Sequence, residues 1–373
     1  MKSYSLSFLL LAALLPAQAE STFRVGTWNL EFLGAPGNFR NNLPPRTKAD
    51  HAAIGKKLGE LGVAVVAVQE VNDEASLREV AAGAGADWNV LLGTSGGWDD
   101  GKTAQRIGFV YDTAQVALLH AEELLALPRT FEGQPIFHRV PVTACFKHKA
   151  SGCDFRLVTV HLKAGQKAQD EQKRRGEAGA LAAWLDAVQQ APGEDPDVIL
   201  LGDFNSTYGT DPQRLFEQSR LRRYLPQPAP APTIQHFPEP IDQVVVGVGC
   251  AEVRLESYAV DSDHDGMAKE AWRQVYSDHY PVTVALVARG DDDPDATFAR
   301  GPASQVLPVR LRPASAWPFV AGASVQVVTA KGPYVGKLLF GVPETGQGFV
   351  TLVTESGTVA IACEQVQAMY LQR

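Results

Sequence analysis

Apolar runs of strand length alternate with segments of helical spacing over the first three quarters of the chain. Residues 23–28 and 63–68 are predicted to form buried strands, and residues 47–61 between them carry apolar side chains at helical intervals. Residues 166–190 predict a long helix that ends before Pro192. Further strands are expected at residues 106–111, 139–146, 155–162, 198–201, 241–246 and 281–287. This alternation predicts an α/β fold.

The pattern changes after residue 290, where an acidic stretch containing proline begins. Such a charged segment is typical of a linker, and we place it at residues 291–303. Residues 304–373 then show short strands separated by glycine-containing turns, which predicts a small closed β-barrel of the SH3-like or Sm-like type. These strands are expected at residues 324–330, 334–340, 348–353 and 358–362. The main α/β domain is accordingly assigned to residues 20–290.

The N-terminus has the pattern of an export signal. Lys2 is followed by an almost wholly apolar run from Leu6 to Leu15 and by the small-x-small cleavage site Ala17-Gln18-Ala19. The run is too short to span a bilayer comfortably, although an uncleaved anchor is the alternative. We therefore expect residues 1–19 to be a signal peptide and the protein to be secreted or periplasmic. No other segment approaches about 18 consecutive apolar residues, so no integral membrane segment is expected after cleavage.

Four cysteines in an exported chain favour disulfide bonds. Cys145 and Cys153 flank a short polar segment between two apolar runs, and we predict that they bridge a hairpin. A bridge between Cys250 and Cys363 would tie the C-terminal region to the main domain. Metal binding by these cysteines is not expected, because no CxxC spacing occurs.

The formal net charge of −8 disfavours tight, sequence-independent storage of nucleic acid, which needs many phosphate contacts. It is compatible with an enzyme that acts on a polyanion through a local basic strip. Such a strip consists of Lys163, Lys167, Lys173, Arg174 and Arg175. It is either the solvated face of a helix or a contact for a polyanion backbone. The acidic residues 261–266 lack the closing glutamate of an EF-hand and are interpreted as a loop.

Polar groups stand at six ends of the predicted strands. Each has an ordinary explanation alone, because an Asn or Asp can cap a turn and a lone His is usually structural. Six strand ends that each present a hard oxygen or an imidazole are difficult to explain in that way, and α/β enzymes carry their chemistry at such ends. The segments are Thr27-Trp28-Asn29-Leu30-Glu31, Gln69-Glu70, His161-Leu162-Lys163, Gly202-Asp203-Phe204-Asn205-Ser206, Ile241-Asp242-Gln243 and Ser277-Asp278-His279-Tyr280-Pro281-Val282.

The order WNLE, QE, HLK, GDFNS, IDQ and SDHYPV resembles the endonuclease/exonuclease/phosphatase superfamily over residues 22–289. That group includes pancreatic-type deoxyribonucleases, abasic-site endonucleases, neutral sphingomyelinases and inositol polyphosphate 5-phosphatases. The resemblance implies a four-layer α/β/β/α sandwich with the site at one edge of the packed sheets. It also implies hydrolysis of a phosphoester with Mg²⁺, or with Mn²⁺ or Ca²⁺, because carboxylates and carboxamides are hard oxygen donors.

The same resemblance implies a role for each strand-end residue. Glu70 would be the main metal ligand, with Asn29 and Asp278 beside it. The other roles follow from what hydrolysis requires, namely an oriented water, charge stabilisation and a proton for the leaving oxygen. Asp203 would orient or activate the water, Asn205 would hold a phosphate oxygen, Asp242 would fix the tautomer of the general acid/base His279, and His161 would stabilise the phosphate or protonate the leaving group.

One position departs from the pancreatic-type pattern. There the histidine that matches His161 is paired with a glutamate just before the strand expected at residues 106–111, where this chain has Gln105 and Arg106. Neither stabilises an imidazolium as a carboxylate would, so we predict that His161 is less easily protonated and serves mainly as a hydrogen-bond donor. Arg106 becomes a candidate phosphate clamp, with a surface strand charge as the alternative. Lys163 and Asn205 complete the predicted substrate-binding set.

The expected function is that of an exported nuclease acting on DNA, with RNA as a second candidate. A sphingomyelinase-type enzyme is the alternative, but it would need exposed apolar loops for membrane contact, and no such cluster is evident. Export argues against an inositide 5-phosphatase. A non-catalytic binding protein on the same fold would be expected to have lost Glu70, Asp203 or His279, and all three are present.

Overall fold

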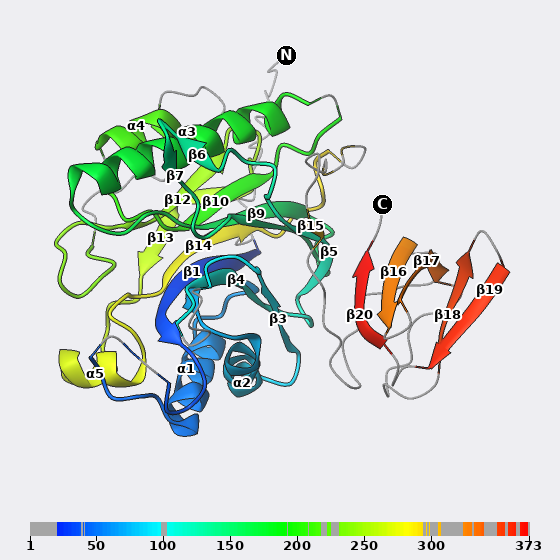
Figure 1. Ribbon diagram of the computed structural model, residues 1–373, viewed down its shortest axis with the longest axis horizontal. Helices are drawn as coiled ribbons and strands as arrows, with labels where there is room; N and C mark the ends of the chain where they lie inside the picture. The colour runs from blue at the N-terminus through cyan, green and yellow to red at the C-terminus, as the bar shows by residue number, and fades with distance from the viewer. Residues whose placement is uncertain are drawn as a thin grey trace, which may run out of the picture.

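The structure, a computed structural model, describes the strands and helices of both parts of the chain (Figure 1). The described residues are 21–38, 40, 42–97, 103–191, 193–207, 209–217, 222–224, 231–293, 296, 298, 305–306, 324–329, 332–338, 349–354, 357–362 and 366–371. The predicted signal peptide at residues 1–19 lies outside them. None of the helices within these ranges is long and apolar enough to cross a membrane.

The first sheet has six strands in the order β13-β14-β1-β2-β4-β3. Its central strand β1 (Thr22–Leu33) runs parallel to β2 (Val65–Val71) and antiparallel to β14 (Val282–Val287). The other strands are β3 (Trp88–Leu92), β4 (Arg106–Asp112) and β13 (Val253–Val260). Helices α1 (Lys48–Glu60) and α2 (Glu74–Ala84) cover its outer face (Figure 1), and α5 (Lys269–Val275) precedes β14.

The second sheet has seven strands in the order β11-β12-β10-β9-β8-β5-β15. They are β5 (Val116–Glu123), β8 (Val142–His148), β9 (Asp154–His161), β10 (Val198–Asp203), β11 (Arg222–Tyr224), β12 (Asp242–Gly247) and β15 (Gln305–Val306). Helices α3 (Ala168–Gln189) and α4 (Asp211–Glu217) cover its outer face (Figure 1). A short hairpin of β6 (Thr130–Phe131) and β7 (Gln134–Pro135) stands beside α3. The four layers agree with the predicted α/β/β/α sandwich.

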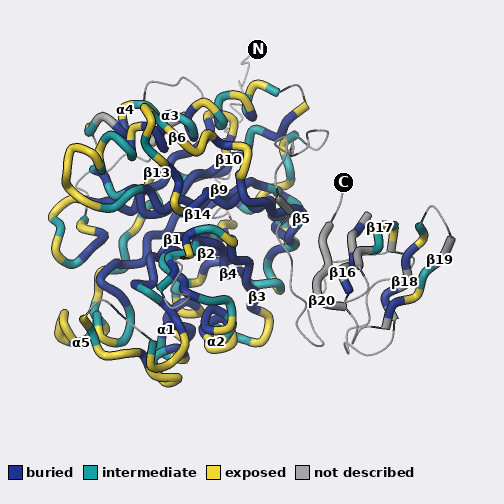
Figure 2. The backbone as a smooth tube through the Cα atoms, in the orientation of Figure 1, coloured by how far each residue is buried: buried dark blue, intermediate teal, exposed yellow. Residues whose placement is uncertain are grey.

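Alternate side chains of the central strands pack on opposite faces of each sheet, as the two-residue period of a strand requires. In β10, Ile199 and Leu201 join the core between the two sheets, whereas Val198 and Leu200 pack toward α3. The strands of both sheets are therefore buried on both sides, and Figure 2 shows exposure mainly on the outer helices and loops. This accounts for continuous apolar runs such as residues 198–201 in place of an alternating pattern.

The predicted elements are found, with shifted ends. The helix expected at residues 47–61 begins after Thr47, whose side chain caps it by accepting a hydrogen bond from the backbone N–H of Asp50. The helix expected at residues 166–190 spans Ala168–Gln189. Helices α2, α4 and α5 and strands β3, β5, β11 and β13 are among the elements that the sequence does not predict, because short elements that are only partly apolar carry a weak periodic signal.

The C-terminal part forms a five-stranded antiparallel sheet in the order β19-β18-β17-β16-β20. Its strands are β16 (Ser324–Thr329), β17 (Gly332–Leu338), β18 (Phe349–Thr354), β19 (Gly357–Ala362) and β20 (Val366–Leu371). Closure of this sheet into a barrel stays a prediction, as do the domain boundaries. Strand β15 pairs with β5 in the second sheet, although residues 305 and 306 lie in the segment assigned from sequence to the C-terminal domain.

The predicted bridge between Cys145 and Cys153 is wrong, because both sulfurs are free of disulfide bonds. The register of the hairpin explains this. Cys145 of β8 stands opposite Arg156 of β9, whereas Cys153 precedes β9 and lies near His148. The two cysteines are therefore about three residues apart along the strands, roughly 10 Å, which is too far for a disulfide. Cys250 likewise forms no disulfide, so the predicted bridge from Cys250 to Cys363, a residue outside the described ranges, is wrong as well.

Candidate active site

An Asp–His pair joins the two sheets at the edge where the predicted site residues meet. Asp242 is the first residue of β12 in the second sheet, and His279 lies just before β14 in the first. His279 Nδ1 lies 2.8 Å from Asp242 Oδ2, and both residues are buried. Burial alone would lower the pKa of His279, but the charge of Asp242 and this hydrogen bond hold it well above its usual value. The pair thus favours an imidazolium with Nε2 available to a third group.

That third group is Asp203, at the end of β10. Strand register places Asp203 opposite both His161 of β9 and Asp242 of β12. Its Oδ2 lies 3.8 Å from His279 Nε2 and 3.5 Å from His161 Nε2. Asn29 Nδ2 donates a hydrogen bond to the same oxygen at 3.1 Å. Burial raises the pKa of Asp203 to about 6, although the positive charge of His279 opposes the shift.

The three predicted metal ligands lie at the same edge. Glu70 near the end of β2 has a left-handed backbone at φ 56°, and its side chain is 13% exposed. Burial raises the pKa of Glu70 to about 7; nearby His279 lowers it, and Asp278 and Asp203 raise it. Asn29 Oδ1 accepts a hydrogen bond from Glu31 N, which orients the amide. The Asp278 carboxylate lies 3.3 Å from the Arg273 guanidinium.

These donors fit a divalent metal ion. Glu70 is a largely buried carboxylate, and one of its oxygens lies 3.8 Å from His161 Nε2. A cation bound between Glu70, Asn29 and Asp278 would relieve the cost of burying that charge. The available ligand atoms are carboxylate and amide oxygens, the donors that Mg²⁺, Mn²⁺ and Ca²⁺ prefer. One carboxylate oxygen of the adjacent pair, Asp242 Oδ1, is also buried and has no hydrogen-bond partner in the described part of the chain.

His161 has an arginine at its backbone, while the Asp203 and Glu70 carboxylates lie near its Nε2. Arg139 donates hydrogen bonds to the backbone oxygens of His161 at 2.9 Å and Leu162 at 2.7 Å. Its third contact is Gln105 Oε1, at 2.7 Å. Burial, together with the charges of Arg139 and His279, lowers the pKa of His161 well below its usual value. This shift favours the neutral imidazole of His161, whose Nδ1 has no hydrogen-bond partner among the described residues.

The predicted substrate-binding residues occupy different environments. Arg106 begins β4, is half-buried, and its Nε has no hydrogen-bond partner among the described residues. Lys163 Nζ is paired with Asp170 Oδ1 at 3.0 Å, so its charge is partly engaged within the protein. Asn205 has a left-handed backbone at φ 49° and donates from Nδ2 to Leu162 O at 3.0 Å. Arg106 is therefore the more available of the two cationic groups.

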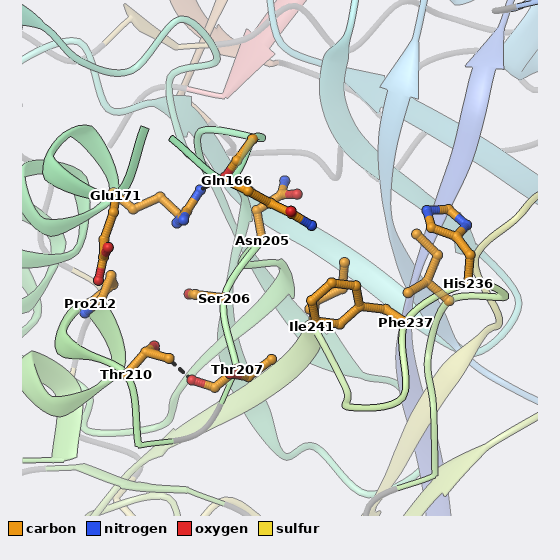
Figure 3. Close-up of a pocket in the computed structure, with 13 residues that line it drawn as sticks. Gln166, Glu171, Asn205, Ser206, Thr207, Thr210, Pro212, His236, Phe237 and Ile241 are labelled. Atoms are coloured by element: carbon orange, nitrogen blue, oxygen red, sulfur yellow. Dashed lines mark hydrogen bonds between the residues drawn. The ribbon is translucent and has the colours of Figure 1, made fainter. Parts of the chain in front are cut away.

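Two cavities open beside these residues. The first, of about 400 Å³, has Asn205, Ser206 and Thr207 on one side and Phe237 and Ile241 on another (Figure 3). The second, of about 630 Å³, is rich in cations and is lined by Gln105, Arg129, His138, Arg139, Lys163 and Lys173, among others. The first offers an apolar ring surface with hydroxyl and amide groups, and the second offers positive charge.

A buried ionic network fixes the end of β1 against the segment before β14. Glu31 accepts from Arg40 Nη2 at 3.0 Å and from Arg273 Nε at 2.8 Å. Arg40 and Arg46 in turn donate to backbone oxygens of residues 273–276. Burial lowers the pKa of Arg46 to about 9, and the charge of Arg40 acts in the same direction. Glu31 belongs to a motif singled out from sequence, but Arg139, Arg40 and Arg46 had no sequence signal.

Fold and site together define a hydrolase of the α/β/β/α class with a carboxylate-rich centre. The chain belongs to the Endonuclease/Exonuclease/phosphatase family, whose profile matches residues 26–279. Members of this family act on phosphodiesters or phosphate esters and typically use divalent metal ions. A deoxyribonuclease of Thioalkalivibrio sp. (strain K90mix) is 27% identical over 202 residues, which cover 53% of this chain and 50% of that protein. The chain therefore spans about half the length of this curated relative.

Solved structures resemble the fold at low identity. An endonuclease/exonuclease/phosphatase from Bacteroides vulgatus has a TM-score of 0.52 and 20% identity, and the match covers 72% of this chain and 99% of that one. A humanized TDP2 from D. rerio has a TM-score of 0.51 and 17% identity, covering 71% and 98%. The catalytic domain of human Nocturnin with a bound sulfate anion has a TM-score of 0.50 and 17% identity, covering 71% and 93%. At these identities the likeness establishes the fold.

Proposed function

We propose that the protein is an exported, divalent-metal-dependent phosphodiesterase that hydrolyses nucleic acid, with DNA as the first substrate and RNA as the second. The observation that carries this proposal is the buried Asp242–His279 pair, whose Nε2 faces Asp203 at 3.8 Å. A gap of this size is too long for a direct hydrogen bond and suits one bridging water, which can accept from Nε2 and donate to the carboxylate.

The residues of this centre divide the work of hydrolysis. Asp203 accepts a hydrogen bond from the attacking water, orients it, and takes up its proton as the new P–O bond forms. His279, held protonated by Asp242, donates a proton from Nε2 to the leaving oxygen as the other P–O bond breaks. His161 stays neutral and donates a hydrogen bond to the phosphate. A divalent cation bound by Glu70, Asn29 and Asp278 would supply positive charge that stabilises the developing negative charge on the phosphate.

A nucleic acid substrate agrees with the surroundings of the centre. Lys163, Arg129 and Lys173 line the second cavity and provide cationic groups for backbone phosphates. Arg106, at the start of β4, follows Gln105, which also lines this cavity. Phe237 offers a ring against which a base could stack in the first cavity (Figure 3). The similarity to a deoxyribonuclease points to the same substrate class. Export is inferred from the N-terminal sequence pattern.

A substrate panel tests this proposal. Purified protein is incubated with plasmid DNA, RNA and sphingomyelin, each with Mg²⁺, Mn²⁺, Ca²⁺ or chelator. We expect metal-dependent cleavage of DNA, or of RNA, and no release of phosphocholine from sphingomyelin. Hydrolysis of sphingomyelin with intact nucleic acids would overturn the assignment of the substrate, and no hydrolysis of any substrate would overturn the assignment as a phosphodiesterase.

The predicted phosphate clamp is tested by Arg106→Met. The substitution should raise KM for DNA and weaken its salt dependence while kcat changes little, since a phosphate contact acts on binding. Arg254→Met on β13 is the matched control, because Arg254 belongs to neither cavity and is placed in no catalytic role. An unchanged KM in Arg106→Met would favour the alternative that Arg106 is only a surface strand charge.

A further inference from the structure

A second group of acidic side chains lies at the opposite end of β10 from the candidate active site. Asp197 comes directly before this strand and Asp203 ends it, six residues or roughly 20 Å further on. One ion cannot serve both places. The group, called the distal acidic cluster below, comprises Asp195 and Asp197 before β10, Glu252 between β12 and β13, and Asp291 and Asp293 after β14.

The carboxylates of the distal acidic cluster converge. Donor atoms of Asp195, Asp197 and Asp293 all lie within 4.8 Å of one another. Asp197 and Glu252 form a second such set with Cys250. Asp291 lies within hydrogen-bond reach of the Asp293 carboxyl, and two carboxylates at that distance need a proton or a cation between them. Asp197 is the member common to the two convergent sets.

Several carboxylate oxygens of the cluster are buried without a compensating partner among the described residues. Asp197 is 3% exposed and Glu252 is 1% exposed. Within the part of the chain that the structure describes, Asp197 Oδ1, Glu252 Oε2 and Asp293 Oδ1 are buried and have no hydrogen-bond partner. Burial, with the charges of Glu252 and Asp195, raises the pKa of Asp197 to about 9. Such an arrangement is costly in a protein unless something positive occupies its centre.

The neighbouring side-chain cations stand at the rim of the cluster. Arg289 contacts Glu252 Oε1 at 3.2 Å, and its side chain is 46% exposed. Lys147 lies 3.8 Å from Asp291 Oδ2, and its side chain is 42% exposed. Among the described residues, no ion pair reaches Asp195, Asp197 or Asp293. The acidic centre is therefore not neutralised by the protein itself.

We propose that the distal acidic cluster is a structural Ca²⁺ site. The convergent set of Asp195, Asp197 and Asp293 offers only hard oxygen atoms, which excludes a preference for soft metals. The carboxylates of the whole cluster come from three separate loops. Ca²⁺ tolerates the irregular geometry of six to eight oxygens that such loops can supply, whereas Mg²⁺ demands an octahedron. A bound ion would fasten the segment after β14 to the base of the second sheet.

The exposed acidic loop at residues 261–266 is not the equivalent site. Two of its carboxylates already share a lysine, because Lys57 Nζ lies 2.9 Å from Asp261 Oδ2 and 3.0 Å from Asp265 Oδ1. A lysine thus occupies the position that a cation would take. The acidic loop thus has a lysine at its centre, whereas the distal acidic cluster has no cation of the described protein at its centre.

Calcium binding is measured by titration calorimetry on chelator-stripped full-length protein carrying Glu70→Gln, which removes the main predicted ligand of the active-site metal. This background should bind one Ca²⁺ per chain. Adding Asp197→Asn should abolish that binding, whereas adding the matched control Asp263→Asn, an exposed loop carboxylate, should leave it unchanged. Asp293→Asn is the second variant should Asp197→Asn fail to fold.

Thermal unfolding provides a readout that a loss of activity would not imitate. Ca²⁺ should raise the Tm of the background by several degrees and leave Asp197→Asn unaffected. In chelator, Asp197→Asn should melt above the background, because it removes one of the repelling carboxylates. Three outcomes would overturn the proposal: no Ca²⁺ uptake by the background, equal uptake by Asp197→Asn, or preferential uptake of Zn²⁺ that Ca²⁺ does not displace.

Discussion

Replacement of Asp242 by asparagine tests the role of the Asp–His pair. Asn has the same shape, so its backbone N–H keeps the hydrogen bond to Thr233 Oγ1, and the strand pair between β10 and β12 is undisturbed. What changes is the charge at 2.8 Å from His279 Nδ1. Burial, which lowers the pKa of His279, then acts without the carboxylate that opposes it. The imidazole becomes neutral at neutral pH and its tautomer is no longer fixed.

The expected loss follows from two contributions. A hydrogen bond to a charged group contributes about 1.5–3 kcal/mol, or roughly a factor of 10 to 150 in rate when it is lost in the transition state. Loss of the proton that His279 donates removes general-acid catalysis, which is typically a factor of about 100 to 10,000. Because both act through one imidazole they are not additive, and we expect kcat to fall by about 100- to 10,000-fold with little change in KM.

Initial rates of plasmid cleavage at saturating Mg²⁺ measure this effect, with Asp263→Asn as the matched control on an exposed loop. The Tm of Asp242→Asn should stay close to that of the wild type, which separates a chemical defect from unfolding. A kcat within a few-fold of the wild-type value would refute the assigned pair, since a carboxylate that neither charges nor orients His279 has no catalytic role.

Three other perturbations follow from the same geometry. Arg139→Met should lower the free energy of unfolding in urea by about 2–5 kcal/mol, because the backbone oxygens of His161 and Leu162 lose buried donors. The control Arg175→Met, at an exposed position, should change that free energy by less than about 0.5 kcal/mol. Gly202→Ala should lower the free energy of unfolding by more than about 2 kcal/mol and lower activity, because φ of Gly202 is +144° and a Cβ would stand 2.2 Å from Val160 O. The control Gly179→Ala, within α3, should leave stability unchanged or raise it. Burial raises the pKa of Asp195 to about 7 and that of Asp197 to about 9, so the folded state holds protons that the unfolded state releases above about pH 4. In chelator, Tm should therefore fall as pH rises from 5 to 9, and less so in Asp197→Asn; a Tm independent of pH in the wild type would contradict this.

Much of the candidate site was predictable because its residues stand at strand ends. His161, Asp203 and Asp242 belong to three adjacent strands, and strand register alone brings them side by side. Motif order and the apolar runs before each motif carried that information. The buried strands read as continuous apolar runs because both faces of each sheet are covered.

The partners of these residues were not predictable. Arg139 lies in a loop before β8 and reaches the backbone after β9, a contact that no local period encodes. Glu31 was visible in a motif, but its partners Arg40 and Arg273 are set by tertiary packing. The Cys145–Cys153 prediction failed because spacing in the chain does not give hairpin register.

The distal acidic cluster was also not predictable from the sequence. The sequence showed an acidic linker near residue 291, yet Asp197 and Glu252 are single carboxylates in separate loops. Only the packing of the second sheet against β14 and the segment that follows it brings them to one place. Long-range convergence of isolated charges leaves no pattern along the chain.

Metal-dependent cleavage of DNA by the wild type and by Glu70→Gln tests the central claim most directly. The wild type should cleave plasmid DNA with Mg²⁺ or Mn²⁺ and lose this activity in chelator. Glu70→Gln should cleave DNA at least about 100-fold more slowly than the wild type, with an unchanged circular dichroism spectrum. In chelator its Tm should be equal to or higher than that of the wild type. The reason is that burial raises the pKa of Glu70 to about 7, so the charge of Glu70 is costly in the metal-free fold. Cleavage by Glu70→Gln at the wild-type rate, or wild-type cleavage that persists in chelator, would contradict the account.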